Sequence, residues 1–221
     1  MSKEVLNRIL EGKIIAIVRG IPSDEVVGLA KALLAGGISC IEVTFDQSSK
    51  EKAEDTLKAI ANIRQALGDQ VCVGAGTVMT VEQVEAAAAA GAEYMISPNI
   101  KAAVIARTTE LDKISIPGAM TVSEIVAANH AGADAVKLFP ASTLGVDFIP
   151  QVRAPLPHIR LLAVSGVGLA DIPAYLQAGA AGFGIGGAIA NRKLCEEGAI
   201  DTIRENAARF AAACRVPEEC R

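Results

Sequence analysis

The sequence lacks three features, each of which would point to a class of protein. It has no excess of basic residues, because 21 lysines and arginines are outnumbered by 25 aspartates and glutamates. The net charge of −4 offers no basic footprint, so we expect neither nucleic acid nor an anionic membrane surface as a partner. No apolar run reaches the roughly 18 residues of a membrane span. The polar first ten residues predict a short amphipathic helix rather than a signal peptide.

Cysteine and histidine are too few and too irregularly spaced for a zinc site or a disulfide framework. The cysteines are odd in number and contain no Cys-x-x-Cys pair. They are Cys40, Cys72, Cys195, Cys214 and Cys220. This pattern favours a protein of the reducing cytoplasm. His130 and His158 have no metal-ligand spacing and fall at expected helix ends or loops, so we predict that both lie on the surface.

Hydrophobic residues make up 51% of the 221 residues and charged residues 21%, which indicates one globular domain over residues 1–221. A glycine next to alanine recurs along this domain, after an alanine-rich or periodic segment and before a short apolar run. Such a glycine is typical of a helix end that leads into a strand. It occurs at Ala35–Gly37, Ala90–Ala92, Ala131–Ala133 and Ala178–Ala180.

Eight short strands alternate with helices when the chain is divided at these points. The predicted strands are Ile14–Val18, Ser39–Phe45, Val71–Ala75, Tyr94–Ser97, Lys113–Pro117, Ala135–Phe139, Ile159–Val164 and Gly182–Ile185. The predicted helices are Ser23–Ala35, Lys50–Leu67, Val81–Ala90, Ile100–Thr108, Thr121–His130, Phe148–Val152, Leu169–Ala178 and Gly198–Cys214. This alternation requires parallel strands, so we predict an α/β fold, a (β/α)8 TIM barrel with a short N-terminal helix. An open doubly wound sheet is less favoured, because no strong Gly-x-Gly-x-x-Gly motif opens the first helix.

Three of the predicted helices begin at side chains that commonly cap helix N-termini. Ser23, Thr80 and Thr121 stand at these starts, each with acidic or amide side chains close behind. The spacings from Thr80 to Gln83 and from Thr121 to Glu124 match a capping box. We therefore expect all three residues to act as N-caps.

Lys137 stands inside the apolar run Ala135–Phe139, in a strand that we expect to be buried on both faces. Burial of an ammonium group is unfavourable, so such a lysine either reaches a carboxylate or has a lowered pKa. A lowered pKa makes the amine nucleophilic near neutral pH, which a Schiff-base enzyme requires. The alternative is that Lys137 reaches solvent from an edge strand or pairs with an acid.

Glu42 is the second charged residue inside a predicted strand. The two strands are the second and the sixth of eight, and positions four strands apart face each other across a barrel. We therefore expect Glu42 and Lys137 to meet inside it. The alternative is a buried structural ion pair, which would raise rather than lower the pKa of the lysine.

Polar or glycine-rich segments follow several strands, at the end of a barrel where active sites lie. Arg19 follows the first strand, and Thr77 follows Gly74-Ala-Gly76 after the third. The seventh and eighth strands lead into the glycine-rich segments Val164–Gly168 and Gly184–Ala188. Loops of this kind commonly bind phosphate through backbone N–H groups, and simple tight turning is the alternative.

Together, six short segments resemble the 2-keto-3-deoxy-6-phosphogluconate/4-hydroxy-2-oxoglutarate aldolases, a family of class I aldolases, in order over nearly the whole chain. The segments are Ile41–Thr44, Gly74–Thr77, Ile96–Pro98, Pro117–Gly118, Lys137–Pro140 and Ile185–Gly187. The resemblance implies a homotrimer of barrels that uses no metal and no cofactor. It also implies that Lys137 forms the Schiff base and that Glu42 moves protons.

The resemblance further implies how a small 2-oxo acid would be held. Arg19, Thr44 and Thr77 would bind its carboxylate, and Pro98 and Phe139 would pack around the pyruvyl group. Backbone and hydroxyl groups after the seventh and eighth strands would hold a phosphate. These residues are Ser165, Gly166, Gly186 and Gly187.

Three departures from the family pattern affect the expected substrate. Asp46 stands where some members carry an arginine, which leaves Arg19 as the carboxylate partner. The usual Thr-Gly-Gly after the seventh strand is replaced by Ser165–Val167. The usual Gly-Gly-Ser after the eighth strand ends in Ala188, so a hydroxyl expected at the phosphate is missing. These departures favour a non-phosphorylated substrate more than the family pattern alone would.

The resulting hypothesis is a lyase that cleaves a 2-oxo-4-hydroxy acid to pyruvate and an aldehyde through a lysine Schiff base. The leading substrates are 2-dehydro-3-deoxy-6-phosphogluconate and 4-hydroxy-2-oxoglutarate. Two alternatives stay open: a sugar-phosphate isomerase or epimerase barrel, and a non-catalytic barrel that binds a keto acid. Both are less favoured, because they leave the interior pair of Glu42 and Lys137 unexplained.

Overall fold

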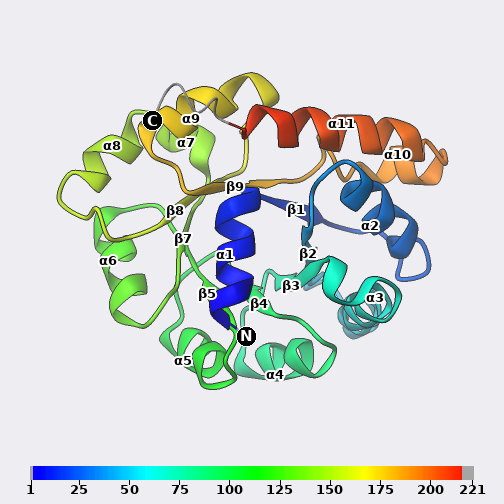
Figure 1. Ribbon diagram of the computed structural model, residues 1–221. Helices are drawn as coiled ribbons and strands as arrows, with labels where there is room; N and C mark the ends of the chain where they lie inside the picture. The colour runs from blue at the N-terminus through cyan, green and yellow to red at the C-terminus, as the bar shows by residue number, and fades with distance from the viewer. Residues whose placement is uncertain (1, 216–221) are drawn as a thin grey trace.

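The computed structural model describes residues 2–215, which form a ring of parallel strands surrounded by helices (Figure 1). Residues 1 and 216–221, among them Cys220, lie outside the described residues. Within residues 2–215, nine strand segments form one sheet in the order β5-β4-β3-β2-β1-β9-β8-β7-β6. The segments are β1 (Ile14–Val18), β2 (Cys40–Thr44), β3 (Cys72–Gly76), β4 (Tyr94–Ile96), β5 (Ile114–Ile116), β6 (Gly118–Ala119), β7 (Val136–Leu138), β8 (Leu161–Val164) and β9 (Gly182–Ile185).

The two ends of this sheet meet, which closes the barrel. Only Pro117 separates β5 from β6, and a proline has no N–H group with which to continue a ladder. The N–H of Lys137 donates to the Pro117 carbonyl at 2.9 Å, and the N–H of Asp134 donates to the Ser115 carbonyl at 3.0 Å. β5 and β6 are thus two halves of one barrel strand. The predicted (β/α)8 barrel is confirmed, although its fifth strand extends beyond Pro117 to Ala119.

Helices connect the strands on the outside of the ring, as Figure 1 shows. The helices are α1 (Ser2–Gly12), α2 (Val26–Ala35), α3 (Lys50–Leu67), α4 (Val81–Ala89), α5 (Ala102–Glu110), α6 (Val122–His130), α7 (Ala141–Leu144), α8 (Phe148–Arg153), α9 (Ile172–Ala178), α10 (Arg192–Glu196) and α11 (Ile200–Ala213), with 3-10 turns at Gly68–Gln70 and Leu169–Asp171. Helices α7 and α10 were not predicted, and they have only four and five residues. The other helices were expected, with ends displaced by a few residues.

The expected N-cap at Ser23 is wrong. Helix α2 begins only at Val26, and the Ser23 hydroxyl instead donates to the Asp55 carboxylate on α3 at 2.6 Å. Thr80 and Thr121 do cap α4 and α6, and Thr121 forms a complete capping box. Ser23 therefore binds a carboxylate on another helix instead of capping the helix that follows it.

Helix α1 lies across one end of the ring (Figure 1). Since it leads directly into β1, this is the end where the strands begin. Val5 and Ile9 of α1 pack on the residues that point into the barrel. These residues include Ile15, Cys40, Cys72, Tyr94, Ile114, Ala135 and Leu162. A second and larger cluster fills the space between the outer face of the sheet and the helices. The strand beginnings are thus sealed by apolar packing, and the strand ends are left free for a site.

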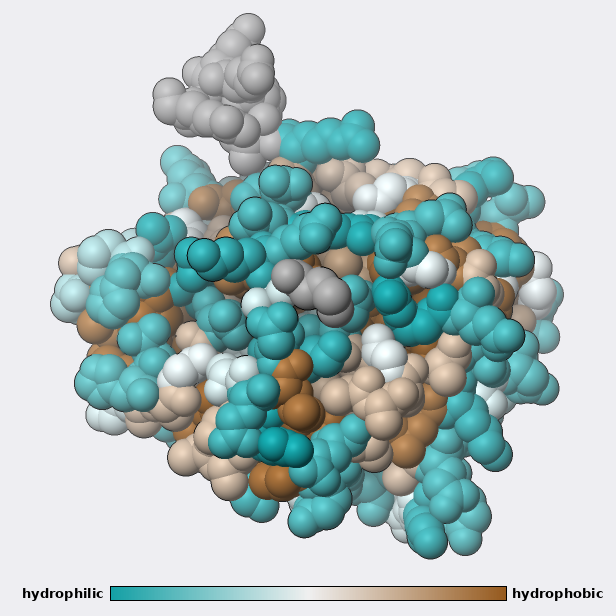
Figure 2. Space-filling view, turned by 60° about the horizontal axis from the view of Figure 1, so that its bottom comes forward, coloured by the Kyte–Doolittle hydropathy of each residue, from teal (hydrophilic) through white to brown (hydrophobic). Residues whose placement is uncertain are grey.

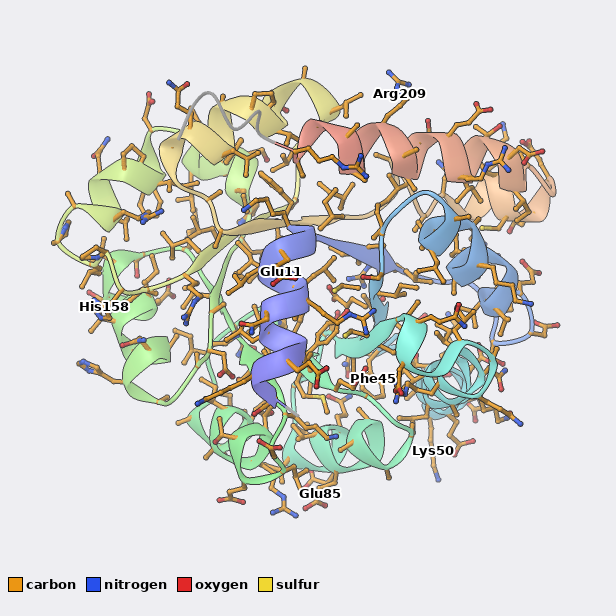
Figure 3. The ribbon with its side chains drawn as sticks, in the orientation of Figure 1. Glu11, Phe45, Lys50, Glu85, His158 and Arg209 are labelled. Carbon is orange, nitrogen blue, oxygen red and sulfur yellow. The ribbon has the colours of Figure 1, made fainter. Side chains whose placement is uncertain are left out.

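Most charged residues lie on the outside of this ring, with Glu42 and Lys137 as buried exceptions. Figure 3 shows Lys50, Glu85, His158 and Arg209 at the periphery, whereas Phe45 is only 2% exposed. Both histidines are exposed, as predicted. The view in Figure 2 is mostly hydrophilic, with apolar residues scattered between polar ones. Among residues 2–215, no helix has the length and apolar character needed to cross a membrane.

Candidate active site

Lys137 lies in the middle of β7 and is only 7% exposed. Its Nζ atom is 4.6 Å from the centroid of the Phe139 ring. Burial lowers the pKa of the Lys137 amine, and the positive charge of Arg19 lowers it further, while Glu42 acts in the opposite direction. Desolvation is the largest of these causes, so the neutral amine is favoured. This is the form of lysine that can attack a carbonyl carbon.

Glu42 lies on β2 and is 2% exposed. Burial raises the pKa of its carboxyl, and the charges of Lys137 and Arg19 oppose this shift. Among the ion pairs within 4.0 Å in the described residues, none joins Glu42 to Lys137. Burial thus shifts both groups toward their neutral forms, and the structural ion pair that we considered from the sequence is not formed within 4.0 Å. A proton donor and a nucleophile can coexist in this arrangement.

Gly76 makes room for the Glu42 carboxyl group. The two residues lie on the neighbouring strands β3 and β2, and a Cβ atom at position 76 would overlap the Oε1, Cδ and Cγ atoms of Glu42. The same strand offers Gly74, over which the ring of Tyr94 lies. The glycines of the Gly-Ala-Gly-Thr segment thus have a packing role that the sequence motif alone did not reveal.

A cavity of about 480 Å³ contains both charged residues. Of the residues predicted for the site, it is lined by Lys137, Glu42, Arg19, Phe139, Ser165, Gly166, Gly186 and Gly187. Five of the remaining lining residues belong to the two glycine-rich segments singled out from the sequence: Val164, Val167, Gly184, Ile185 and Ala188. The sixth, Ile17, was missed. Ile17 could have been found by the period of two along β1, because it lies two positions before Arg19. The structure therefore brings together eight of the predicted residues around one space.

The loops after β8 and β9 form one wall of this cavity. Ser165 and Gly166 both have a left-handed backbone, with φ of 79° and 73°. Within residues 2–215, the N–H groups of Gly166, Gly187 and Ala188 donate to no protein acceptor. Free N–H groups that face a common space form a binding site for an anion.

A neighbouring cavity of about 360 Å³ shares Arg19 with the first one. The Arg19 Nη2 atom donates to the Thr77 hydroxyl at 3.4 Å, so these two predicted residues lie together. Thr44 also lines this second cavity, but its hydroxyl donates to the Val18 carbonyl at 3.3 Å. Pro98 lines neither cavity, and its carbonyl lies against Gly118. Thr44, Thr77 and Pro98 therefore do not line the Lys137 cavity, whereas Arg19, Thr44 and Thr77 share the neighbouring one.

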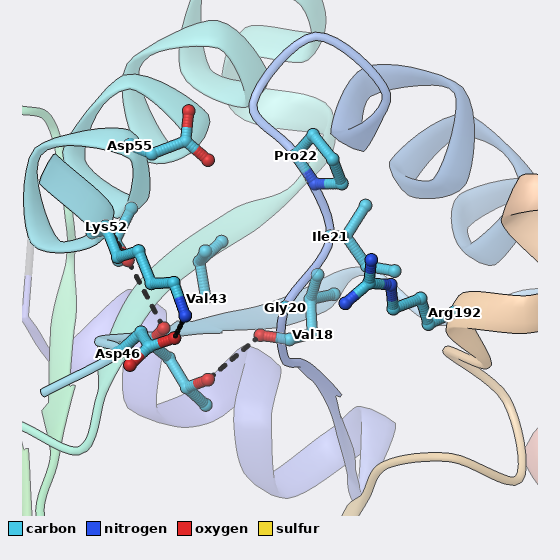
Figure 4. A pocket seen from close by; sticks show the side chains of 11 residues that line it. Val18, Gly20, Ile21, Pro22, Val43, Asp46, Lys52, Asp55 and Arg192 are labelled. Atoms are coloured by element: carbon cyan, nitrogen blue, oxygen red, sulfur yellow. Dashed lines mark hydrogen bonds and ion pairs between the residues drawn. The ribbon is translucent and has the colours of Figure 1, made fainter. Parts of the chain in front are cut away.

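Figure 4 shows a third cavity, of about 170 Å³, between β1, α3 and Arg192. Its dashed lines include the ion pair between Lys52 and Asp46, whose Nζ and Oδ2 atoms are 3.1 Å apart. Hydrogen bonds from Ser48, and then Lys52, lower the pKa of Asp46 to about 2. Asp46 is thus a carboxylate that is already paired with Lys52. Arg19, by contrast, lines the same cavity as Lys137.

A model of the family described as KDPG and KHG aldolase matches residues 5–206. The chain belongs to this family. It is 36% identical to the 2-dehydro-3-deoxy-6-phosphogalactonate aldolase of Escherichia coli K12 over 174 residues, which are 78% of this chain and 82% of the relative. It is also 36% identical to the 2-dehydro-3-deoxy-phosphogluconate aldolase of Treponema pallidum over 174 residues, 78% of either chain. The chain is therefore an aldehyde-lyase of the aldolase type.

Solved structures of the family have the same fold. A native KDPGal structure superimposes with a TM-score of 0.82 at 33% identity, covering 90% of this chain and 93% of the other. The KDPG aldolase of Legionella pneumophila, with pyruvate captured as a covalent carbinolamine intermediate, has a TM-score of 0.80 at 26% identity, with the same coverage. The barrel of this aldolase is therefore the barrel of its family.

Proposed function

We propose that this aldolase cleaves a 2-keto-3-deoxy acid to pyruvate and an aldehyde through an imine on Lys137. The observation that carries the proposal is a buried amine with a lowered pKa, in a cavity that also holds a buried carboxyl of raised pKa. The covalent carbinolamine of pyruvate in the Legionella relative supports it. Neither the isomerase nor the binding barrel requires a neutral interior lysine.

The proposed reaction begins when the lone pair of the Lys137 amine attacks C2 of the substrate. Glu42, protonated at the start, gives its proton to the carbonyl oxygen, and the carbinolamine loses water to form a protonated imine. The Glu42 carboxylate then takes the proton of the C4 hydroxyl. The C3–C4 electron pair moves into the imine, an aldehyde leaves, and an enamine remains. Protonation at C3 and hydrolysis of the imine release pyruvate and restore the amine.

The pyruvyl carboxylate is proposed to bind between Arg19 and Thr77, which are already in contact. Phe139 would pack against the carbon chain, since its ring lies beside the Lys137 amine. We assign Thr44 and Pro98 supporting roles: one links β2 to the Val18 carbonyl, and the other packs on Gly118. The resemblance also leads us to propose a homotrimer in the cytoplasm, which sedimentation and fractionation would test.

We propose a phosphorylated six-carbon acid as the substrate, because Gly166, Gly187 and Ala188 line the Lys137 cavity and their N–H groups donate to no acceptor within residues 2–215. The relatives named for 2-dehydro-3-deoxy-6-phosphogalactonate and 2-dehydro-3-deoxy-phosphogluconate support this choice. A second candidate is 4-hydroxy-2-oxoglutarate, because Ala188 supplies no hydroxyl to a phosphate. The ratio of kcat/KM for the two phosphorylated epimers and for 4-hydroxy-2-oxoglutarate decides among them.

The proposal is tested by adding pyruvate and sodium borohydride and locating the adduct by peptide mass spectrometry. We expect a reduced pyruvyl group on Lys137 alone. The exposed Lys58→Met variant should form the adduct as the unchanged protein does. Folded protein without any adduct would contradict the imine mechanism and favour the isomerase or the binding barrel.

A further inference from the structure

Thr77 has a backbone conformation that a β-branched residue rarely adopts. It follows β3 directly, and its φ is 57°, in the left-handed region. Residues held in such a conformation persist only where the surrounding structure fixes them, and they are frequent at ligand sites. The contacts that fix Thr77 therefore bear on the site in which it takes part.

Two glutamine side chains form a chain of hydrogen bonds that ends on Thr77. The Gln47 Nε2 atom donates to the Thr77 carbonyl at 2.8 Å, and the Gln83 Nε2 atom donates to Gln47 Oε1 at 3.0 Å. Gln83 Oε1 in turn accepts from the Met79 N–H at 2.7 Å. Each amide group is thus used through both its oxygen and its nitrogen. Gln83 stands in the first turn of α4, so the chain is anchored on a helix.

The other side of Thr77 faces the proposed carboxylate site. Its hydroxyl accepts from Arg19 Nη2 at 3.4 Å, and Arg19 also lines the cavity that holds Lys137. Arg19 is exposed, and Thr77 is the one side-chain partner that the described residues give it. The backbone of Thr77 limits the directions that its hydroxyl can take, because the branched Cβ atom of threonine restricts the χ1 angle.

We infer that Gln47 and Gln83 are positioning residues for 2-oxo acid binding: they hold Thr77 in its left-handed conformation, and thereby hold its hydroxyl and Arg19 where the substrate carboxylate binds. The inference rests on the proposed function. Neither glutamine lines the Lys137 cavity, and Gln47 lines the neighbouring cavity together with Arg19 and Thr77. The hydrogen bond to the Thr77 carbonyl is the contact through which we expect Gln47 to act. The alternative is that the glutamines only tie the loop after β2 to α4.

The test measures the rate of borohydride trapping as a function of pyruvate concentration. The Gln47→Ala variant should need about two- to tenfold more pyruvate for half-saturation, the usual effect of losing one hydrogen bond, with an unchanged limiting rate. Gln151→Ala, an exposed position on α8, is the matched control and should leave both quantities unchanged. An unchanged half-saturation in Gln47→Ala would overturn the inference.

A second comparison separates positioning from a tie between loop and helix. Thr77→Gly removes the hydroxyl, but glycine adopts a left-handed φ without strain and needs no glutamine to hold it. In the Thr77→Gly background, Gln47→Ala should therefore change the half-saturation by less than twofold. An equal effect of Gln47→Ala in both backgrounds would contradict positioning through Thr77.

The outcomes also separate this inference from the proposed function. Unchanged protein that forms no adduct at any pyruvate concentration would refute the imine on Lys137. Unchanged protein that forms the adduct, together with a Gln47→Ala variant of equal half-saturation, would refute only the role of the glutamines.

Discussion

The two ends of the barrel are made by the same strands and have opposite properties. β2 places Cys40 in the apolar layer under α1 and Glu42, two residues later, in the cavity of the other end. In the closed end, Ile9 and its neighbours bury apolar surface, which stabilises the fold. In the open end, burial acts on ionisable groups and favours their neutral forms. Burial inside the same barrel thus stabilises the fold at the closed end and favours the neutral forms of Lys137 and Glu42 at the open end.

The sharpest test of this division is Lys137→Met, which keeps the length of the side chain but removes the amine. We expect cleavage activity to fall on the order of 10⁴-fold or more, as for the loss of a nucleophile. The melting temperature should stay equal or rise, because a buried amine opposes folding. Steady-state rates and thermal unfolding measure the two effects. A Lys137→Met variant that lost both stability and activity would contradict the conclusion that the open end does not stabilise the fold.

Ile9→Ala is the reciprocal change at the closed end. Ile9 is 1% exposed under the barrel, so its truncation should lower the unfolding free energy by about 2–5 kcal/mol. The kcat/KM of the folded fraction should not change. Urea unfolding and rates measured well below the melting temperature test this. A tenfold loss of kcat/KM in folded Ile9→Ala would show that the packing of α1 at the closed end also affects the geometry of the site.

The periodicity of the strands predicts some features of the candidate site and not others. Lys137 and Glu42 could be found because a charge in an apolar strand stands out, and their strand numbers place them across the barrel. The period of two gives the inward direction of a side chain, but not its height along the axis. That height depends on the stagger between strands, and periodicity therefore could not show that Thr44, Thr77 and Pro98 do not line the Lys137 cavity.

Partners distant in sequence explain the other differences. Ser23 meets Asp55, which no local capping rule could foresee. The role of Gly76 depends on where the Glu42 carboxyl group lies, and hence on the pairing of β2 with β3. The division of the fifth strand at Pro117 could have been expected, because proline removes a ladder donor.

Gly76→Ala tests whether the position of Glu42 matters for the reaction. The added Cβ atom would displace the Glu42 carboxyl, and a displacement of about 1 Å can lower a rate by about 10²-fold. We expect this loss in kcat, whereas Gly12→Ala, which meets no atom within 4 Å, should have none. Steady-state kinetics of both variants provide the measurement. An unchanged kcat in Gly76→Ala would argue against proton transfer by Glu42.

The pH dependence should respond to a charge at the open end only. Burial lowers the pKa of Lys137 from its ordinary value, and kcat/KM should rise with pH as the amine loses its proton. The charge of Arg19 lowers this pKa, hence Arg19→Gln should move the acid limb to higher pH. Arg8→Gln, in α1 at the closed end, is the control and should leave the limb in place. A limb that stayed in place in Arg19→Gln would contradict the assignment to Lys137.

The smallest expected effect concerns Tyr94, which lies between the two ends. Its hydroxyl is the one buried side-chain polar atom in residues 2–215 without a hydrogen-bond partner. Tyr94→Phe removes this group and should raise the unfolding free energy by about 1 kcal/mol, because an unsatisfied buried hydroxyl opposes folding. Tyr175→Phe is the matched control: its hydroxyl donates to the Ala141 carbonyl at 3.2 Å, so its loss should lower the unfolding free energy by about 1 kcal/mol. Urea unfolding of both variants gives the two signs. A loss of stability in Tyr94→Phe would contradict this expectation and would mean that the hydroxyl has a hydrogen-bond partner, such as a buried water.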